Sequence, residues 1–331
     1  MANAILVTGE VADGALIPLT AEMLGAARRM AEGSGQSVAC VLIGSGVEGK
    51  AQDAIALGAD EVLVVDDPAL AEYNTDTYLQ AMLKVAESAS GGSPAIILFG
   101  QTNVGRDLAP RLAYRLETGV IMDCVELAME GDRLHATRPC YGGNARAVNM
   151  VRTDPQIATV RAKSQDAAQP DSSRQGQVTK IDATIDQAAV RVKVTGRQGV
   201  PEEGVRLEDA DVVVSGGRGM GGPENFDVIE ELAAALGGAV GASRAVCDLD
   251  WRPVSDQVGL TGKVVSPTLY IAVAISGASQ HMAGCSGSKN IVAINKDPAA
   301  NIFKASRFGI AEDFAKVMKP FIEAVKKEKG A

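Results

Sequence analysis

Residues 211–222 read DVVVSGGRGMGG and place a glycine-rich loop between a short apolar strand and a predicted helix, Asn225–Leu236. Gly217, Gly219 and Gly222 match the spacing G-x-G-x-x-G. Glycines at this spacing let the backbone approach a pyrophosphate at a helix N-terminus. A tight strand–helix turn without a ligand produces the same spacing. The stretch therefore predicts an α/β unit with a parallel sheet and leaves its ligand open.

The glycine motif lacks the acidic residue that accompanies it in NAD-binding proteins. In NAD-binding units an acidic residue stands about 20 residues further on, after the next strand, and holds the ribose. Here the next predicted strand, Ala239–Gly241, is followed by Ala-Ser-Arg, so Arg244 stands where the acid is expected. This departure counts against an NAD-dependent dehydrogenase.

Polar residues also follow the other predicted strands of this half. The strands Leu269–Ile275 and Asn290–Ile294 are followed by SGASQH (276–281) and by Asn295, and the stretch QVGLTGK (257–263) lies earlier. Ligands bind beyond the carboxyl ends of parallel strands. The recurrence therefore predicts one site for a large, polyoxygenated ligand.

Single residues of this set also have simpler interpretations. Ser243 is placed to cap a helix, Thr261 to sit in a turn, and His281 to satisfy a buried carbonyl. Their recurrence at successive strand ends is what favours a binding site.

The first half alternates strand and helix patterns, which indicates βαβ units and a mainly parallel sheet buried on both faces. The predicted strands are Ala4–Val11, Ser37–Ile43, Glu61–Val65 and Ala95–Phe99. The predicted helices are Leu19–Ala31, Val47–Leu57, Asp76–Ala89 and Gly105–Leu116, the last starting near Thr102 or Asn103. Four further strands, predicted to extend the sheet or to flank it, are Val120–Ala128, Arg133–Thr137, Ala145–Val151 and Ile157–Val160.

Two polar stretches interrupt the pattern. Ala162–Gln177 has no periodicity and is predicted to be a loop or linker. Ala188–Val194 is predicted to be one more strand, and the domain boundary is expected within Thr195–Arg206. Arg106 and Asp107 form either a second functional loop or an ion pair at a helix start.

The predicted fold class is α/β. Residues 1–200 form an N-terminal, mainly parallel βαβ domain with extra strands, which is expected to face a partner. Residues 201–331 form a C-terminal, doubly wound, Rossmann-like domain that ends in the helix Ala311–Lys327.

Composition narrows the function. The chain has 331 residues, of which 46% are hydrophobic. Its formal net charge of -9 argues against electrostatic, sequence-independent binding to nucleic acid, which requires a positively charged protein surface. No apolar run reaches the ~20 residues that span a bilayer. The first residues lack the basic region of a signal peptide. We therefore expect a cytoplasmic protein that is not embedded in a membrane.

Cysteine and histidine usage argues against a metal centre. The five cysteines contain no C-x-x-C pair and are expected to be buried small hydrophobes, and the two histidines, His135 and His281, are too few for a three-histidine site. We predict no metal and no catalytic acid–base pair.

The second half resembles a known family over about 100 residues. The stretches SGGRGMGG, FDVIEELAAALGGAVGASRAVCD, QVGLTGKVVSPTLYIAVAISGASQHMAG and SKNIVAINKDPAANIF are similar to the α subunit of electron transfer flavoprotein, the FixB family. GRDLAPRLAYRLETG and PCYGGNARA in the first half also resemble it. The resemblance implies a C-terminal domain that binds FAD and a chain that is an electron carrier rather than an enzyme with its own small-molecule substrate.

The resemblance also implies roles for particular residues. Arg218 matches the arginine of the glycine loop, and Ser243 and Arg244 match a pair whose arginine lies over the flavin ring and raises its potential. Thr261 matches a threonine that reaches flavin N5, beside Gln257, Val258, Gly259 and Leu260. The loop at the phosphates and ribityl chain matches Ser276, Gly277, Ala278, Ser279, Gln280 and His281, with the histidine near flavin O2. The adenosine contacts match Asn295 and Asp313, next to Phe314.

The sequence departs from the family pattern at three places. Leu260 replaces a common glutamine, Ser306–Gly309 replaces Ala-Asp-Tyr-Gly, and Cys285–Ser288 replaces Met-Lys-Asp-Ser. The first lies beside the flavin loop, so the potential of the flavin need not equal that of other members. None removes a residue matched to a ligand contact.

The resemblance further implies a heterodimer with a β subunit that holds AMP or a second flavin. Electrons would pass from flavoprotein dehydrogenases, such as the acyl-CoA dehydrogenases of fatty acid β-oxidation, to a quinone oxidoreductase or a similar acceptor. An electron-bifurcating subunit coupled to NADH and ferredoxin is the alternative. An NAD-dependent dehydrogenase and a nucleotide-binding module without redox chemistry are more distant ones.

Overall fold

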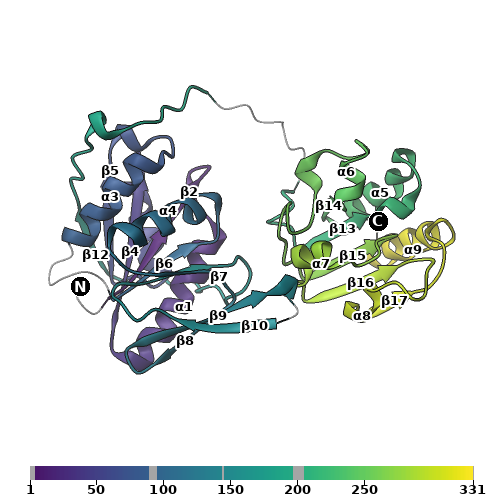
Figure 1. The fold of residues 1–331 in the computed structure, drawn as a ribbon, viewed down its shortest axis with the longest axis horizontal. Coiled ribbons are helices and arrows are strands. Elements are labelled where there is room, and N and C mark those ends of the chain that lie inside the picture. The colour runs from purple at the N-terminus through teal and green to yellow at the C-terminus, as the bar shows by residue number, and fades with distance from the viewer. Residues whose placement is uncertain (1–3, 89–94, 144, 197–204, 331) are drawn as a thin grey trace. The chain divides into compact units, whose positions relative to one another are not determined.

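The computed structural model describes residues 4–88, 95–143, 145–196 and 205–330 (Figure 1). The chain divides into two compact units, one of Met1–Pro139 with Arg146–Gln198 and one of Cys140–Ala145 with Gly199–Ala331. The predicted boundary within Thr195–Arg206 falls largely on residues 197–204, which lie outside the described residues, as does Ala89 at the end of one predicted helix.

The first unit is built on a seven-stranded, fully parallel sheet of order β12-β5-β4-β1-β6-β11-β7. Its strands are β1 (Ala4–Gly9), β4 (Ser37–Gly44), β5 (Glu61–Asp66), β6 (Ile96–Gly100), β7 (Val120–Cys124), β11 (Gln156–Val160) and β12 (Gln177–Lys180). Its helices are α1 (Pro18–Ser34), α2 (Ala51–Ala56), α3 (Thr75–Ser88) and α4 (Asn103–Arg115). A short hairpin of β2 (Val11–Ala12) and β3 (Ala15–Leu16) follows β1.

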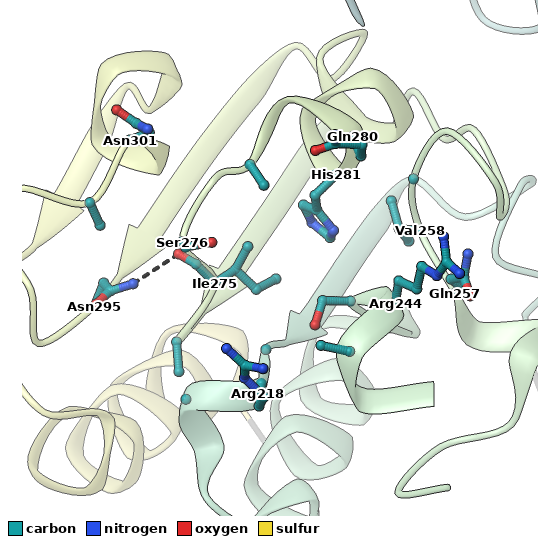
Figure 2. Close-up of a pocket in the computed structure, with 18 of the residues that line it drawn as sticks. Arg218, Arg244, Gln257, Val258, Ile275, Ser276, Gln280, His281, Asn295 and Asn301 are labelled. Carbon is teal, nitrogen blue, oxygen red and sulfur yellow. Dashed lines mark hydrogen bonds between the residues drawn. The ribbon is translucent and has the colours of Figure 1, made fainter. Parts of the chain in front are cut away.

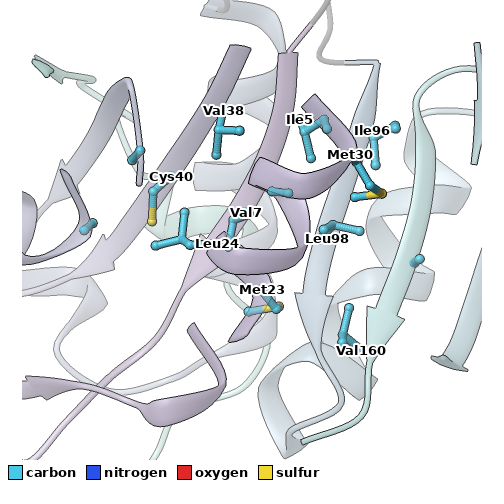
Figure 3. Packing of buried hydrophobic residues seen from close by; sticks show 14 of the residues in the cluster. Ile5, Val7, Met23, Leu24, Met30, Val38, Cys40, Ile96, Leu98 and Val160 are labelled. Carbon is cyan, nitrogen blue, oxygen red and sulfur yellow. The ribbon is translucent and has the colours of Figure 1, made fainter. Parts of the chain in front are cut away.

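Both faces of this sheet are buried, as predicted from its continuous apolar strands. Ile5 and Val7 of β1 pack with Met23 of α1 on one face (Figure 3). Leu6, which points to the opposite face, packs with residues of α3 and α4, such as Leu112. Thr102 caps α4 by accepting a hydrogen bond from the Gly105 amide at 3.0 Å, which confirms the predicted start of this helix.

The extra strands divide between two sheets. β7 and β11 extend the parallel sheet, whereas β8 (Glu126–Glu130), β9 (Arg133–Cys140) and β10 (Ala145–Met150) form a separate three-stranded sheet. The single strand predicted over Val120–Ala128 is therefore wrong, because β7 ends at Cys124 and the chain enters the other sheet at Glu126. Asp123, with φ of 66°, makes β7 irregular just before this break, and Arg161 binds its carboxylate through hydrogen bonds of 2.8 and 2.6 Å.

The strand predicted over Ala188–Val194 is also wrong. This stretch forms a 3-10 turn, Gln187–Ala189, and then irregular chain in which Val192 is 65% exposed. Its alternation of valines with basic residues is typical of a strand, but the free edge of β5 is already paired with β12. β12 begins at the last residue of the predicted Ala162–Gln177 loop, and its short polar sequence QVTK gave no apolar signal.

The second unit has a five-stranded parallel sheet of order β14-β13-β15-β16-β17. Its strands are β13 (Val212–Gly216), β14 (Ala239–Ala242), β15 (Leu269–Val273), β16 (Asn290–Ile294) and β17 (Phe308–Ile310). Its helices are α5 (Asp227–Leu236), α6 (Arg244–Cys247), α7 (Ser279–Cys285), α8 (Ile302–Ala305) and α9 (Phe314–Lys329).

The helices of the second unit cover both faces of its sheet, as a doubly wound fold requires. α5 and α9 pack on one face around Val214 and Ile271, and α7 and α8 pack on the other around Tyr270. The strand order reverses between β13 and β15, so their carboxyl ends flank the topological switch point, where such folds bind ligands.

Candidate functional site

A cavity of about 810 Å³ lies at the carboxyl ends of β13, β14, β15 and β16 (Figure 2). This size is within the range of small-molecule and cofactor sites. It gathers most of the residues that the sequence placed at one site, namely Arg218, Ser243, Arg244, Gln257, Val258, Gly259, Leu260, Thr261, Ser276, Ala278, Gln280, His281 and Asn295.

The glycine loop owes its glycines to packing within the protein. A Cβ atom at Gly217 would lie 2.2 Å from the Ala274 carbonyl oxygen, and one at Gly219 would lie 3.0 Å from it. The loop thus passes close over the end of β15, which corresponds to the tight-turn interpretation of the motif. One 3-10 turn, Arg218–Met220, lies within the loop, and a second, Pro223–Phe226, separates the loop from α5, which begins at Asp227. The literal G-x-G-x-x-G therefore does not open directly into an α-helix.

Two arginines bring positive charge to the cavity. Arg218 follows β13, is exposed, and makes no ion pair with the described residues. Arg244 is the first residue of α6, is 67% exposed, and pairs with Asp248 on its own helix at 3.4 Å. Ser243 precedes α6 but makes no side-chain capping bond, so the capping interpretation is not realised by its hydroxyl.

The loop from Gln257 to Gly262 forms one wall and is fixed from both sides. The Val258 amide donates to the Ala242 carbonyl at 2.9 Å, and the Leu260 amide donates to the Gln280 carbonyl at 2.8 Å. The wall is therefore tied to the end of β14 and to α7. Thr261 sits in a turn, as its simpler interpretation proposed, and also lines the cavity.

Gln257 orients the threonine hydroxyl. The buried Gln257 side chain donates from Nε2 to Thr261 Oγ1 at 3.0 Å. Since a hydroxyl both accepts and donates, the proton of Thr261 stays available to a ligand.

His281 is buried in α7, and its ring points toward the middle of the cavity (Figure 2). Nε2 lies 2.8 Å from the Tyr270 hydroxyl, whereas the buried Nδ1 has no hydrogen-bond partner of normal geometry among the described residues. Burial lowers the pKa of the ring to about 4, and the Val258 backbone opposes part of that shift. The imidazole is thus neutral near pH 7.

Asn295 has a structural role besides lining the cavity. Its Nδ2 donates to the Ile275 carbonyl at 2.8 Å, and its Oδ1 accepts from the Asp297 amide at 2.9 Å, so it joins the ends of β15 and β16. One N–H of the amide is left for a ligand.

Four residues of the predicted set do not line the cavity. Gly277, with φ of 80°, packs against the backbone of Ile302, and the Ser279 hydroxyl bonds to the Gln280 side chain. Asp313 caps α9 through the Ala315 amide at 3.0 Å, and Phe314 packs in the core beneath α9.

Several lining residues were not singled out from the sequence, namely Ala245, Asp248, Ala274, Ile275, Asp297, Ala299, Ala300 and Asn301. Most of them directly follow a strand or neighbour a predicted site residue. Position after a strand end was the available signal for them, and five of the eight are alanine or isoleucine, which carry no chemical signature of their own.

Other candidate features of the sequence have structural explanations. Asp107 pairs with Arg111 at 3.2 Å and accepts hydrogen bonds from Tyr73 and Thr75, so it forms no ion pair with Arg106. Burial raises the pKa of the Cys40 thiol to about 12, and the five cysteines form no disulfide with one another in the described part of the chain. In the part of the chain that the structure describes, no cluster of three or more acidic, histidine or cysteine side chains is arranged for a metal ion. No helix among the described residues has the length and apolar character to cross a bilayer.

The cavity suits a ligand with charged, polar and apolar parts. Arg218 and Arg244 supply positive charge beside Asp248 and Asp297, and Val258 and Ile275 supply apolar surface. His281 presents a buried Nδ1 without a hydrogen bond of normal geometry among the described residues. A parallel doubly wound sheet with such a cavity at its switch point defines a dinucleotide-binding α/β protein.

Comparison with known proteins gives the family. The family model described as an electron transfer flavoprotein domain matches residues 5–186, and the one described as the electron transfer flavoprotein FAD-binding domain matches residues 206–286. The chain belongs to the electron transfer flavoprotein α-subunit family, and FAD is the cofactor of its C-terminal domain.

The similar proteins match over nearly their whole length. The chain is 47% identical over 327 residues to the electron transfer flavoprotein subunit alpha of Thermoanaerobacterium thermosaccharolyticum and 42% identical over 327 residues to that of Bacillus subtilis, with 98% of each chain covered in both cases. It is 35% identical over 352 residues to the acryloyl-CoA reductase electron transfer subunit beta of Anaerotignum propionicum, with 97% of this chain and 95% of the other covered. The α-subunit family implies a β-subunit partner.

Proposed function

We propose that this chain holds FAD in the cavity of its second unit and carries electrons between two other redox proteins, as one subunit of a heterodimer. The observation that supports this most is the gathering of residues from four strand ends around one cavity of about 810 Å³. The FAD domain is taken as residues 201–331, and residues 1–200 are proposed to face the partner subunit. A cytoplasmic location stays a prediction.

Different residues around the cavity are proposed to bind different parts of FAD. Ser276, Ala278 and Gln280 are proposed to hold the phosphates and ribityl chain, with Arg218 at the glycine loop. Asn295 is proposed to hold the adenosine portion through its one remaining N–H. Asp313 and Phe314 are also proposed to contact the adenosine portion, although neither lines the cavity.

At the other end, FAD supplies a ring that accepts and releases electrons. The wall from Gln257 to Thr261 is proposed to lie beside that ring, with the Thr261 proton held available by Gln257. Arg244 places positive charge where negative charge grows on reduction. His281, neutral near pH 7, contributes a hydrogen bond rather than a full charge.

We further propose a flavoprotein dehydrogenase of the acyl-CoA type as electron donor and a quinone oxidoreductase or similar protein as acceptor. The similarity to a protein named as an electron transfer subunit of acryloyl-CoA reductase supports an acyl-CoA-linked partner. The electron-bifurcating alternative requires a second flavin in the β subunit. Counting flavins per heterodimer therefore separates the two.

A pair of matched substitutions tests the cavity. Ala278 lines the cavity and is exposed, so Ala278→Trp would fill it without disturbing the core. Ala305 is exposed on α8 outside the cavity, so Ala305→Trp is the control. In an FAD titration monitored by flavin fluorescence, Ala278→Trp should weaken binding at least tenfold and Ala305→Trp should not. Equal affinities would remove the cavity as the flavin site.

A further inference from the structure

Tyr270, whose hydroxyl contacts His281, is a fully buried tyrosine in the core of the second unit. Tyr270 lies in β15, is 0% exposed, and heads the largest fully buried side chains of the described chain. Its side chain lies in a largely apolar core with Val213 and Ile291, and Ser215 and Cys285 lie beside the hydroxyl. A buried hydroxyl needs a hydrogen-bond partner, and His281 Nε2 at 2.8 Å supplies it.

We propose that Tyr270 is a positioning residue: its hydroxyl donates to His281 Nε2, and so fixes the imidazole as the tautomer whose proton is on Nδ1. This inference rests on the proposed function, because it concerns the donor that His281 offers to the flavin. Tyr270 itself is proposed to act only through His281.

The placement of protons follows from the contacts. Burial raises the pKa of Tyr270 well above its usual value, so the hydroxyl stays protonated. The neutral imidazole of His281 carries one N–H. Ser215 and Cys285 also lie beside the hydroxyl, but among the described residues Nε2 of His281, at 2.8 Å, is the acceptor with normal hydrogen-bond geometry.

Two arrangements of the pair are possible in principle. If Nε2 carried the proton, the tyrosine proton would have Ser215 and Cys285 as its nearest other acceptors among the described residues. Neither makes a hydrogen bond of normal geometry with it, and such a loss costs about 1–3 kcal/mol. If Nδ1 carries it, the Tyr270–His281 bond is complete, and the remaining N–H is on the nitrogen that has the Val258 backbone nearby but no hydrogen bond of normal geometry among the described residues. The second arrangement leaves one donor for a ligand acceptor in the cavity.

The neighbouring groups do not disturb this assignment. Cys285 Sγ lies 3.6 Å from the His281 carbonyl oxygen, and burial keeps its thiol neutral by raising its pKa to about 12. The shift of the His281 pKa has no contribution from a neighbouring charge. The orientation of the ring is therefore set by the tyrosine hydroxyl, by the Val258 backbone and by packing.

The first experiment is independent of flavin. In the ¹⁵N spectrum of the folded, histidine-labelled protein at pH 7, His281 should show a protonated Nδ1 and an unprotonated Nε2, assigned by comparison with His281→Gln. Tyr270→Phe should shift the ring toward a mixture of the two tautomers. A wild-type His281 protonated on Nε2 would overturn the proposal, whatever the protein does with FAD.

The second experiment measures the flavin potential in the heterodimer. Tyr270→Phe keeps the volume and removes the donor, so reduced FAD should lose about tenfold in affinity relative to oxidised FAD, which corresponds to a potential lower by about 30 mV for the two-electron couple. Tyr270→Phe should add nothing further in a His281→Ala background. An unchanged potential in Tyr270→Phe would contradict the proposal. So would a Tyr270→Phe substitution that lowers the potential of His281→Ala by as much as it lowers that of the wild type.

A matched control separates this role from stability. Tyr78, in the first unit, also has a hydrogen-bonded hydroxyl, which donates to the Leu70 backbone carbonyl at 3.1 Å. Tyr78→Phe should lower thermal stability without moving the flavin potential. Failure of the wild-type protein to bind FAD would count against the proposed function, while the ¹⁵N result would still decide the tautomer.

Discussion

Arg244 offers the clearest test of how the cavity acts on a flavin. Two charges 4 Å apart interact by about 1 kcal/mol in water and about 4 kcal/mol near a protein surface. The side chain is 67% exposed and its partner Asp248 lies 3.4 Å away, which places Arg244 near the weaker limit. A loss of about 1 kcal/mol on the reduced side lowers a one-electron potential by about 40 mV and a two-electron potential by about 20 mV.

The assay is a redox titration of Arg244→Ala in the heterodimer, monitored by flavin absorbance. The potential should fall by this amount while FAD affinity changes less, and the difference should shrink as salt is added, because an exposed charge is screened. Asp248→Asn should raise the potential, since it removes a negative charge from the same helix. A potential that moves in neither variant would refute the placement of Arg244 beside the ring.

Three further predictions concern stability. Burial raises the pKa of Glu10 to about 7, opposed by a hydrogen bond from Thr102, so the folded state keeps a proton that the unfolded state releases and stability falls as pH rises from about 4.5 to 7. Glu10→Gln should therefore gain up to about 3 kcal/mol over wild type at pH 8 and little at pH 4, in urea unfolding. His281 has the opposite sign, because its pKa is lowered to about 4, so stability falls as pH drops from about 6.5 to 4, and His281→Gln should flatten that part of the profile. Gly217→Ala should cost about 1–3 kcal/mol or more, since its Cβ would meet a backbone oxygen at 2.2 Å, whereas Gly49→Ala, which meets nothing within 4 Å, should leave the melting temperature nearly unchanged. Equal pH profiles for wild type and either pH variant, or equal melting temperatures for the two glycine variants, would contradict these assignments.

Much of the fold could be predicted because its strands are apolar on both faces. β1, β4 and β6 gave continuous runs of Val, Ile and Leu, and each lies in the parallel sheet as expected. β12 and β17 were missed because they are short edge strands with exposed side chains, which need no apolar pattern. Pairing at an edge depends on which segment arrives there.

The sequence could predict where the site lies and which residues gather there, but not the contacts that these residues make. Strand ends converge in a parallel sheet, so residues such as Ser243 and Ser276 could be placed together from sequence. Contacts between segments that are distant in the sequence could not be predicted, because they depend on how those segments pack against one another. The contact of Tyr270 with His281, and the close approach of Gly217 to Ala274, are both of this kind.

The central claim, that the cavity at the switch point of the second sheet binds FAD, is tested most directly by titrating the cofactor-stripped protein with FAD and following flavin absorbance and fluorescence. The account predicts saturation at one FAD per chain, with no displacement by an equal concentration of NAD⁺, because Arg244 stands where the ribose-binding acid of NAD sites is expected. Absence of saturable binding, or displacement of FAD by NAD⁺, would contradict it.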